Sequence, residues 1–227
     1  MRVVPRGTDV DREFWLERWR LNQIGFHQVE FNARLMQHWA SLEVPPGSRV
    51  FVPLCGKSRD MLWLAEQGHP VLGVELAAPA VEAFFAEAKL PNTQHTSGAL
   101  TLYKSARINI FCRDFFELTP PDLTGVDAVF DRGALVALPG ETRARYADHL
   151  LSLLSTGTEI LLLTIEYDQS RVAGPPFSIT EKEVGTLFGK RCSIDVLEAT
   201  VSDRVPPSFQ ANGIREAGES VYRIVTA

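Results

Sequence analysis

One glycine-containing turn and one acid, each next to an apolar run, are the residues whose types and spacing point most directly to chemistry. The turn Cys55-Gly56-Lys57-Ser58 follows residues 50–54, which have the composition of a strand buried on both faces. Glu75 ends the next apolar run, 19 residues after Gly56. In nucleotide-binding βαβ units the backbone approaches the ligand at such a turn, and an acid about 20 residues later binds the ribose. We therefore predict an adenosine-type ligand at this turn.

The glycine pattern distinguishes between classes of nucleotide. A dinucleotide site needs G-x-G-x-x-G so that the backbone can close on a pyrophosphate, and here only Gly56 is present. A P-loop needs G-x-x-x-x-G-K-[ST]; Gly56-Lys57-Ser58 matches its end, but Phe51 stands where the first glycine is required. Both phosphate-binding classes are therefore disfavoured. S-adenosylmethionine (SAM), an adenosine without phosphate, fits the pattern; the alternative is a plain βαβ unit in which Glu75 is only solvated.

The predicted elements place this turn and this acid in a doubly wound α/β sheet. Strands are expected at 50–54, 71–74, 108–111, 128–130, 160–165, 192–201 and 221–226. Helices are expected at 11–20, 28–42, 61–65, 79–89, 141–155 and 181–189, with turn-rich residues at 91–105 and a long loop at 205–219. Because strands and helices alternate, we predict a mainly parallel sheet with helices on both faces. The last two strands, with no helix between them, should add an antiparallel C-terminal pair.

Polar residues follow the carboxyl ends of several predicted strands. Asp114 follows 108–111, Asp131 and Arg132 follow 128–130, and Glu166 ends the run at 160–165. In doubly wound sheets ligands bind outside the carboxyl ends of the strands, where the strand order reverses. We therefore expect these side chains to meet Gly56 and Glu75 at one site.

Length and composition agree with a single-domain enzyme. The 227 residues carry a net charge of −5, which offers no basic field for nucleic acid or a membrane surface. No apolar run approaches the ~20 residues that span a bilayer, and the N-terminus lacks the apolar core of a signal peptide. Three widely spaced cysteines point to a cytoplasmic protein without a disulfide framework or metal site. We expect a flexible lead-in at 1–10, a helical arm or lid at 11–44, a SAM-binding domain at 45–227, and a monomer.

Five fragments of the sequence resemble one enzyme family. They are FWLERWRLNQIGFHQVEFN, VPLCGKSRDMLWLAEQGH, GVEL, CRDFFEL and DRGALVALP, in this order. They closely resemble thiopurine S-methyltransferases, especially the bacterial members, over about residues 11–227. The resemblance implies a Rossmann-like methyltransferase fold and methyl transfer from SAM to the sulfur of an aromatic or heterocyclic thiol, leaving S-adenosylhomocysteine. Methylation of selenium and tellurium oxyanions is attached to some bacterial relatives, and the physiological acceptor is left open.

The resemblance also implies which residues bind SAM. Trp19 matches a contact whose indole can cover the sulfonium by cation–π attraction, its alternative role being that of a core tryptophan. Leu54 matches a residue whose backbone meets SAM, and Glu75 matches the acid that binds the ribose. Asp114 and Phe115 align with residues that flank the adenine.

Four residues are expected near the methyl acceptor. Arg132 matches an arginine near both SAM and the acceptor, where its charge would favour an anionic thiol; the simpler alternative is a salt bridge with Asp131 or Glu141. Phe26 matches a position that packs on the acceptor ring. Arg204 and Phe209 are expected to line the acceptor pocket from the long loop.

The predicted mechanism needs few protein groups. Holding sulfur and methyl carbon about 3–3.5 Å apart in line provides most of the acceleration, and a general base is optional for an acidic thiol. His27, beside Phe26, and Cys55, in the turn, are more simply structural residues. Two alternatives stay open: an oxidoreductase on a Rossmann sheet, which the missing glycines disfavour, and a non-catalytic SAM-binding protein.

Overall fold

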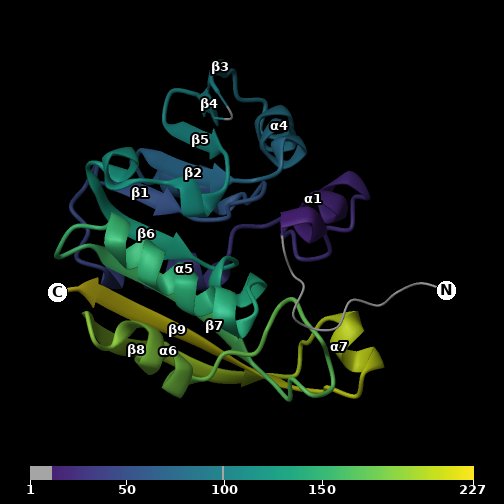
Figure 1. Ribbon diagram of the computed structural model, residues 1–227. Helices are drawn as coiled ribbons and strands as arrows, with labels where there is room; N and C mark the ends of the chain where they lie inside the picture. Colours follow the sequence, from purple (N-terminus) through teal and green to yellow (C-terminus); the bar gives the residue numbers. More distant parts are fainter. Residues whose placement is uncertain (1–11, 99) are drawn as a thin grey trace.

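Parallel strands form the centre of a nine-stranded sheet in the computed structural model of the chain (Figure 1). The structure describes residues 12–98 and 100–227. The strands are β1 (Arg49–Val52), β2 (Val71–Glu75), β3 (Thr93–Ser97), β4 (Leu100–Lys104), β5 (Ile108–Cys112), β6 (Val126–Asp131), β7 (Glu159–Glu166), β8 (Cys192–Ser202) and β9 (Ala217–Thr226). The α-helices are α1 (Arg12–Arg20), α2 (Ala33–His38), α3 (Asp60–Glu66), α4 (Ala78–Glu87), α5 (Gly140–Leu153), α6 (Glu181–Phe188) and α7 (Pro207–Ala211). Short 3₁₀ helices are η1 (Trp39–Ser41), η2 (Phe115–Glu117), η3 (Pro120–Leu123) and η4 (Leu135–Ala137).

The strand order is β3-β4-β5-β2-β1-β6-β7-β9-β8, and β5, β2, β1, β6 and β7 run parallel. The chain passes outward from β1 through β2 to β5 and then returns to β6 on the other side of β1. The order therefore reverses between β1 and β6, and in such sheets this switch point is where ligands bind. β9 lies antiparallel between β7 and β8, so the predicted doubly wound sheet with an antiparallel C-terminal pair is confirmed.

Helices cover both faces of the sheet. Successive strand residues point to opposite sides, so each central strand contributes side chains to both buried clusters. In β1, Val50 and Val52 pack in one buried cluster with side chains of α2, α3 and α4, whereas Phe51 packs in the other with those of α5 and α6. Every residue of β2 is buried, which explains the nearly continuous apolar run. Among the described residues, no helix is both long enough and apolar enough to cross a membrane.

Gly73 in β2 is required by close packing. A Cβ atom at this position would lie 2.8 Å from the Cys55 sulfur and 3.3 Å from the side chains of Ile110 and Met61. The absence of a side chain at Gly73 therefore lets the turn after β1 pack directly against the next strand.

The N-terminal segment divides into two parts with different packing. Leu35, Trp39 and Leu42 are buried in the core. Glu198 on β8 pairs with Arg34 at 3.2 Å and is hydrogen-bonded to the His38 ring at 2.7 Å. By contrast, α1 has no buried residue. Figure 1 shows α1 on the side of the sheet to which β1 and β2 point, with α7 also on that side. The segment that extends over the strand ends is therefore 12–32; the predicted lead-in at 1–10 lies outside the described residues.

One predicted helix is shorter than expected. We predicted a helix over 28–42, but α2 begins only at Ala33. The Asn32 side chain accepts hydrogen bonds from the backbone N–H groups of Arg34 and Leu35, at 3.0 Å and 3.2 Å. An asparagine that caps in this way fixes the helix start at the next residue.

Two segments predicted as irregular contain regular structure. The segment predicted as turn-rich, 91–105, contains the antiparallel pair β3–β4 at one edge of the sheet. Each residue of β3 is exposed, so its sequence, TQHTS, lacks the apolar alternation that predicts a strand. The predicted loop at 205–219 contains α7, so the expectation of no helix between the last two strands is also wrong. A five-residue helix that begins at a proline pair is too short for its periodicity to be recognised.

Candidate functional site

A cavity of about 1080 Å³ lies at the carboxyl ends of the central strands, at the switch point between β1 and β6. Its volume lies just above the usual range of small-molecule sites, about 300–1,000 Å³. The sequence-predicted residues that line it come from α1, the segment after α1, four strand ends and α7: Trp19, Phe26, Leu54, Glu75, Asp114, Phe115, Arg132 and Phe209. Nine site residues were predicted, and the ninth, Arg204, is not part of the wall.

The turn after β1 is held in an unusual backbone conformation. Leu54 has φ of 45° and Gly56 has φ of 51°, so two residues near the end of β1 lie in the left-handed region. Leucine rarely adopts this region, and such residues concentrate at functional sites where the surrounding structure holds them. The backbone N–H of Cys55 donates to the carbonyl of Val74 at 2.9 Å and ties the turn to β2. The backbone at Leu54 therefore faces the cavity in a fixed geometry.

Glu75 links this turn to the end of β2. Its Oε2 accepts a hydrogen bond from the backbone N–H of Gly56, and its Oε1 accepts one from Ala77, both at 2.8 Å. The side chain is only 7% exposed, and burial raises its pKa, an effect that neighbouring backbone N–H groups, first that of Ala77, partly offset. A carboxylate offers about four acceptor positions, so two remain for a ligand.

Trp19 lies directly on the glycine turn. A Cβ atom at Gly56 would stand 3.0 Å from the Trp19 ring, so the glycine permits this approach. Phe26 packs edge-to-face against both Trp19 and Trp15, with ring centroids 5.7 Å apart in each case. These three rings form an aromatic wall between the arm and the cavity, and 43% of Phe26 is exposed.

Arg132 has a different ion-pair partner from either acid weighed in the sequence analysis. Its Nη2 lies 3.1 Å from Oδ2 of Asp60 and 3.3 Å from Oγ of Ser58. Asp131, one of the two acids considered, instead accepts from the Tyr146 hydroxyl at 2.7 Å and from the N–H groups of Ala134 and Leu135. Burial raises the pKa of Asp131, and the Tyr146 hydroxyl partly offsets this effect. Asp131 therefore braces the loop after β6, whereas Arg132 faces the cavity.

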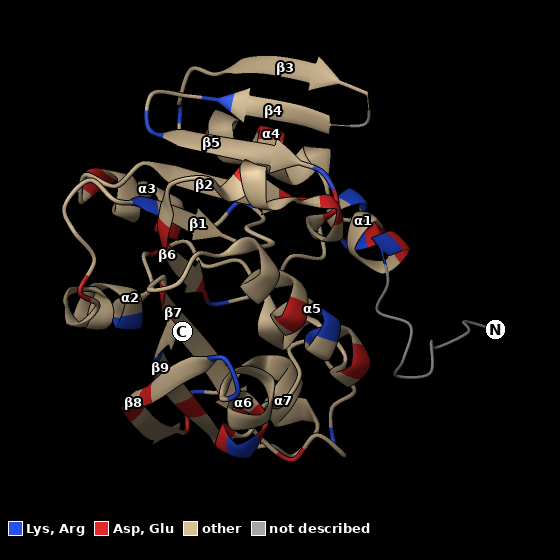
Figure 2. Ribbon diagram, turned by 60° about the vertical axis from the view of Figure 1, so that its left-hand side comes forward, with Lys and Arg blue, Asp and Glu red and all other residues tan. Residues whose placement is uncertain are grey.

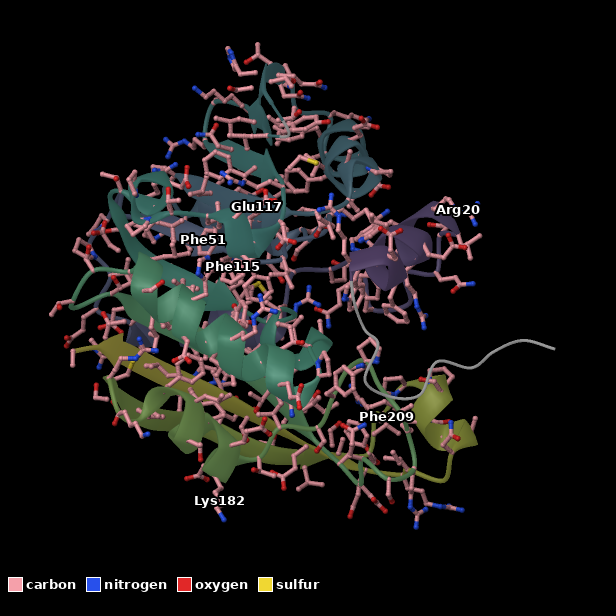
Figure 3. All side chains as sticks on the ribbon, in the orientation of Figure 1. Arg20, Phe51, Phe115, Glu117, Lys182 and Phe209 are labelled. Atoms are coloured by element: carbon pink, nitrogen blue, oxygen red, sulfur yellow. The ribbon has the colours of Figure 1, made fainter. Side chains whose placement is uncertain are left out.

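Asp114 and Phe115 lie where β5 leads into η2. The Asp114 side chain caps η2 by accepting from the backbone N–H of Phe116 at 2.9 Å. Phe115 is 5% exposed and stacks on Phe51 with centroids 6.5 Å apart, in the middle of the molecule (Figure 3). Phe115 therefore has a large share in the core as well as a face on the cavity.

The two residues predicted from the long loop have separate positions. Phe209 lines the cavity but is 1% exposed and packs against Tyr167, with ring centroids 4.4 Å apart. It is part of α7, and Figure 3 shows it well away from Phe115. Arg204 is exposed, and the structure gives its side chain no place in the cavity wall. The predicted contact of Arg204 with the acceptor therefore lacks support, because the chain turns inward only after it, at Val205.

Positive charge prevails around the cavity although the chain has a net charge of −5. Acidic and basic residues are interspersed along α1 and α5 (Figure 2). The described cavity lining, however, includes seven basic residues and three acidic ones: Arg12, Arg18, Arg34, Lys57, Arg113, Arg132 and Arg145 against Glu75, Asp114 and Glu219. Such a field favours an anionic ligand group.

The remaining reactive side chains have environments that keep them neutral. Burial, followed by the charge of Lys57, lowers the pKa of His27, so its imidazole is uncharged at pH 7. Burial and Glu75 raise the pKa of the Cys55 thiol well above its usual value, so it is a poor nucleophile. Within 12–98 and 100–227 there is no group of three or more His, Cys, Asp or Glu residues that could hold a metal ion.

Sequence analysis missed two residues that shape this site, Asp60 and Tyr146. Both are almost completely buried, at 1% and 0% exposure. Asp60 follows Ser58 by two residues at the start of α3, and this Ser-x-Asp spacing could have indicated a local hydrogen-bonded acid. Tyr146 had no comparable local pattern, because its partner Asp131 is on another element.

Comparison with known proteins gives one family. The family model described as thiopurine S-methyltransferase matches residues 10–227. A thiopurine S-methyltransferase of Nitrosospira multiformis is 48% identical over 215 residues, which are 95% of this chain and 98% of the relative. One of Pseudomonas fluorescens is 45% identical over 216 residues, covering 95% and 99%. Among solved structures, a Burkholderia thailandensis 1,6-didemethyltoxoflavin-N1-methyltransferase with bound 1,6-didemethyltoxoflavin and S-adenosylhomocysteine has a TM-score of 0.62 at 18% identity, covering 95% of this chain and 87% of that one.

Proposed function

The chain belongs to the thiopurine S-methyltransferase family, and from this premise we propose that it transfers the methyl group of SAM to the sulfur of an aromatic or heterocyclic thiol. The observation that carries the proposal is the meeting, at the switch point, of a glycine turn without a phosphate cradle and a buried carboxylate with two acceptor positions left. This combination suits SAM, because its adenosine presents ribose hydroxyls but no phosphate.

The residues that would hold SAM follow from this geometry. Glu75 would accept hydrogen bonds from the ribose hydroxyls, and the backbone at Leu54 would meet the adjoining part of the molecule. Asp114 and Phe115, at the end of β5, would flank the adenine. Trp19, already packed on Gly56, would cover the positive sulfonium from the arm, an attraction of about 0.5–2 kcal/mol depending on desolvation.

The acceptor would enter between the arm and α7. Phe26 and Phe209 supply apolar surface for a flat ring, and Arg132 supplies positive charge beside the sulfur. SAM provides the methyl group and leaves as S-adenosylhomocysteine. The thiol proton is lost to solvent before the carbon–sulfur bond forms, and Arg132 favours the resulting thiolate. No general base is required, because heterocyclic thiols already ionise appreciably near neutral pH, and the un-ionised Cys55 thiol offers no base.

The same proposal includes the finer properties expected from the sequence. All three cysteines are free thiols, which supports a reducing cytoplasm. A monomer that needs no metal and binds neither nucleic acid nor membrane remains our expectation. Family membership gives no support to the oxidoreductase alternative.

One experiment tests the proposal and separates a catalyst from a non-catalytic SAM-binding protein. The protein is incubated with methyl-labelled SAM and a panel of aromatic thiols, heterocyclic thiols, aliphatic thiols, selenite and tellurite. We expect label on the sulfur of the aromatic and heterocyclic thiols, with equal formation of S-adenosylhomocysteine. Binding of SAM without labelled product from any acceptor would contradict the proposed reaction.

The role of Arg132 needs its own variants. If its charge favours the thiolate, Arg132→Ala should lower turnover most for thiols of high pKa, and Arg132→Lys should recover part of the loss because it keeps the charge. An equal loss for all thiols, together with a lower melting temperature, would leave Arg132 a structural partner of Asp60 only.

A further inference from the structure

Asp60 is a buried acid that the proposed reaction has not yet used. It is the first residue of α3, and 1% of its side chain is exposed. A buried carboxylate is stable only when its oxygens are paired with donors, and both oxygens of Asp60 are. Oδ1 accepts from the backbone N–H of Asn32 at 2.8 Å, and Oδ2 accepts from the Ser58 hydroxyl at 3.0 Å and from Nη2 of Arg132 at 3.1 Å.

The contacts of Asp60 restrict the Arg132 side chain. A free arginine has many rotamers, but here Nη2 is held between Asp60 and Ser58, 3.1 Å and 3.3 Å away. Among the described residues, the hydrogen bonds recorded for the Arg132 guanidinium all involve Nη2. The other side of its planar fork can therefore face the cavity that Arg132 lines.

The remaining contact of Asp60 connects the same carboxylate to the arm. Asn32 is the N-cap of α2 and the residue at which the arm joins the packed body of the fold. The carboxylate thus joins the base of the arm, the turn after β1 and the residue after β6. These are the segments that carry Trp19, Leu54 and Arg132.

We propose that Asp60 is a positioning residue for methyl transfer, which fixes the Arg132 guanidinium beside the acceptor sulfur and holds it in register with the base of the arm. This inference rests on the proposed function of Arg132. A misplacement of about 1 Å can cost as much as roughly 100-fold in rate, so a fixed guanidinium matters more than the charge alone.

The sign of the expected effect distinguishes positioning from simple charge. A negative Asp60 offsets the positive field of Arg132, so its neutralisation should help a thiolate form if only the field matters. If position matters, neutralisation should lower turnover. Asp60→Asn separates the effect of charge from the effect of position, because the amide oxygen can still accept from Asn32 and the amide N–H can donate to Ser58. The contact with Arg132 is lost, since two N–H donors then face each other, and the Ser58 contact is kept only with donor and acceptor exchanged.

The experiment is a double-mutant cycle of Asp60→Asn and Arg132→Ala, with kcat and KM measured for SAM and for one active aromatic thiol. We expect Asp60→Asn to lower kcat by about 10- to 100-fold, with KM for SAM changed less than about twofold. The double variant should be no slower than Arg132→Ala alone, because the two residues act as one unit. Glu87→Gln is the matched control: it removes the acid 2.6 Å from Lys57, another basic residue of the cavity wall, and should leave kcat unchanged.

Further measurements keep the outcomes distinct. Nuclear magnetic relaxation of the Arg132 side chain should show a rigid guanidinium in the wild type and a mobile one in Asp60→Asn. If Asp60→Asn does not fold, Ser58→Ala removes one of the two contacts of Nη2 and should give a smaller loss of kcat with the same non-additivity. Additive losses, faster turnover in Asp60→Asn, or an equally rigid Arg132 would overturn the inference. A wild type that methylates no acceptor would instead overturn the proposed function, whatever the relaxation data show.

Discussion

Glu75 has two tasks in this structure, and replacing it with glutamine separates them. The carboxylate accepts one backbone N–H on each oxygen, from Gly56 and from Ala77. Glutamine keeps one acceptor oxygen but presents an amide NH₂ to the other backbone N–H. One hydrogen bond to a charged group is therefore lost, which costs about 1.5–3 kcal/mol. Burial penalises the charged form of Glu75, as its raised pKa shows. Because glutamine carries no charge, it avoids this penalty, which reduces the cost.

Two separate measurements follow from these magnitudes. Without ligand, Glu75→Gln should lower the melting temperature by at most roughly 3–12 °C, at 2–4 °C per kcal/mol for a chain of this size. With ligand, loss of the charged acceptor for the ribose hydroxyls should weaken S-adenosylhomocysteine binding by about 10- to 150-fold, at 1.4 kcal/mol per tenfold. Calorimetric titration gives the affinity, and thermal unfolding without ligand gives the stability.

The control and the refuting results are equally direct. Glu66→Gln makes the same charge change at an exposed position of α3 and should alter neither quantity. A folded Glu75→Gln variant that binds S-adenosylhomocysteine within twofold of the wild type would remove Glu75 from the ribose site. An unchanged melting temperature would show that the hydrogen bonds to Gly56 and Ala77 do not stabilise the turn.

Three further outcomes are expected. Gly56→Ala should weaken cofactor binding and change the Trp19 fluorescence, because φ of 51° is unfavourable for alanine and the new Cβ would lie 3.0 Å from the indole; unchanged emission would contradict that contact. Burial raises the pKa of Asp131, so the stability it contributes is complete below its unfolded pKa of 3.8 and is lost as pH rises through the folded pKa. Urea unfolding at several pH values should therefore show the free energy of unfolding of Asp131→Asn rising relative to that of the wild type as pH rises above 3.8. A difference in free energy that stays constant with pH would argue against the shift. Amide exchange at 12–28 should slow when S-adenosylhomocysteine is added, since α1 has no buried residue to protect it; equal protection with and without ligand would make the arm a static part of the fold.

The strands that position the site could be predicted because their local sequence patterns are sufficient to identify them. The runs before Leu54 and Glu75 are apolar throughout because both faces of the central strands are covered. The polar residues after these runs lie at the switch point because parallel strands bring their carboxyl ends to one edge. The alternation of strands and helices along the chain was sufficient to predict the doubly wound sheet.

Other features depend on tertiary contacts that local patterns do not contain. The strand β3 is exposed, so its apolar alternation is missing although β4 pairs with it. The ion-pair partner of Arg132 is Asp60, 72 residues earlier, and a search among sequence neighbours suggested Asp131 and Glu141 instead. The position of Arg204 depends on where the chain turns inward, which the sequence does not specify. Long-range pairing, rather than weak propensity, limited the prediction of β3 and of the Arg132 partner, and the contact of Arg204 with the acceptor stays a prediction.

The missing side chain at Gly73 makes two distant positions interdependent. Because a Cβ there would lie 2.8 Å from the Cys55 sulfur, residue 73 cannot gain a side chain while residue 55 keeps an atom at the Sγ position, unless β1 or β2 moves. Across homologous chains the two positions should covary, with a larger residue at 73 found only beside a smaller one at 55. A designer who wishes to remove the buried Cys55 thiol could therefore combine Cys55→Gly with Gly73→Ala, an exchange of volume across the two strands, and expect the turn that carries Gly56 to stay in place.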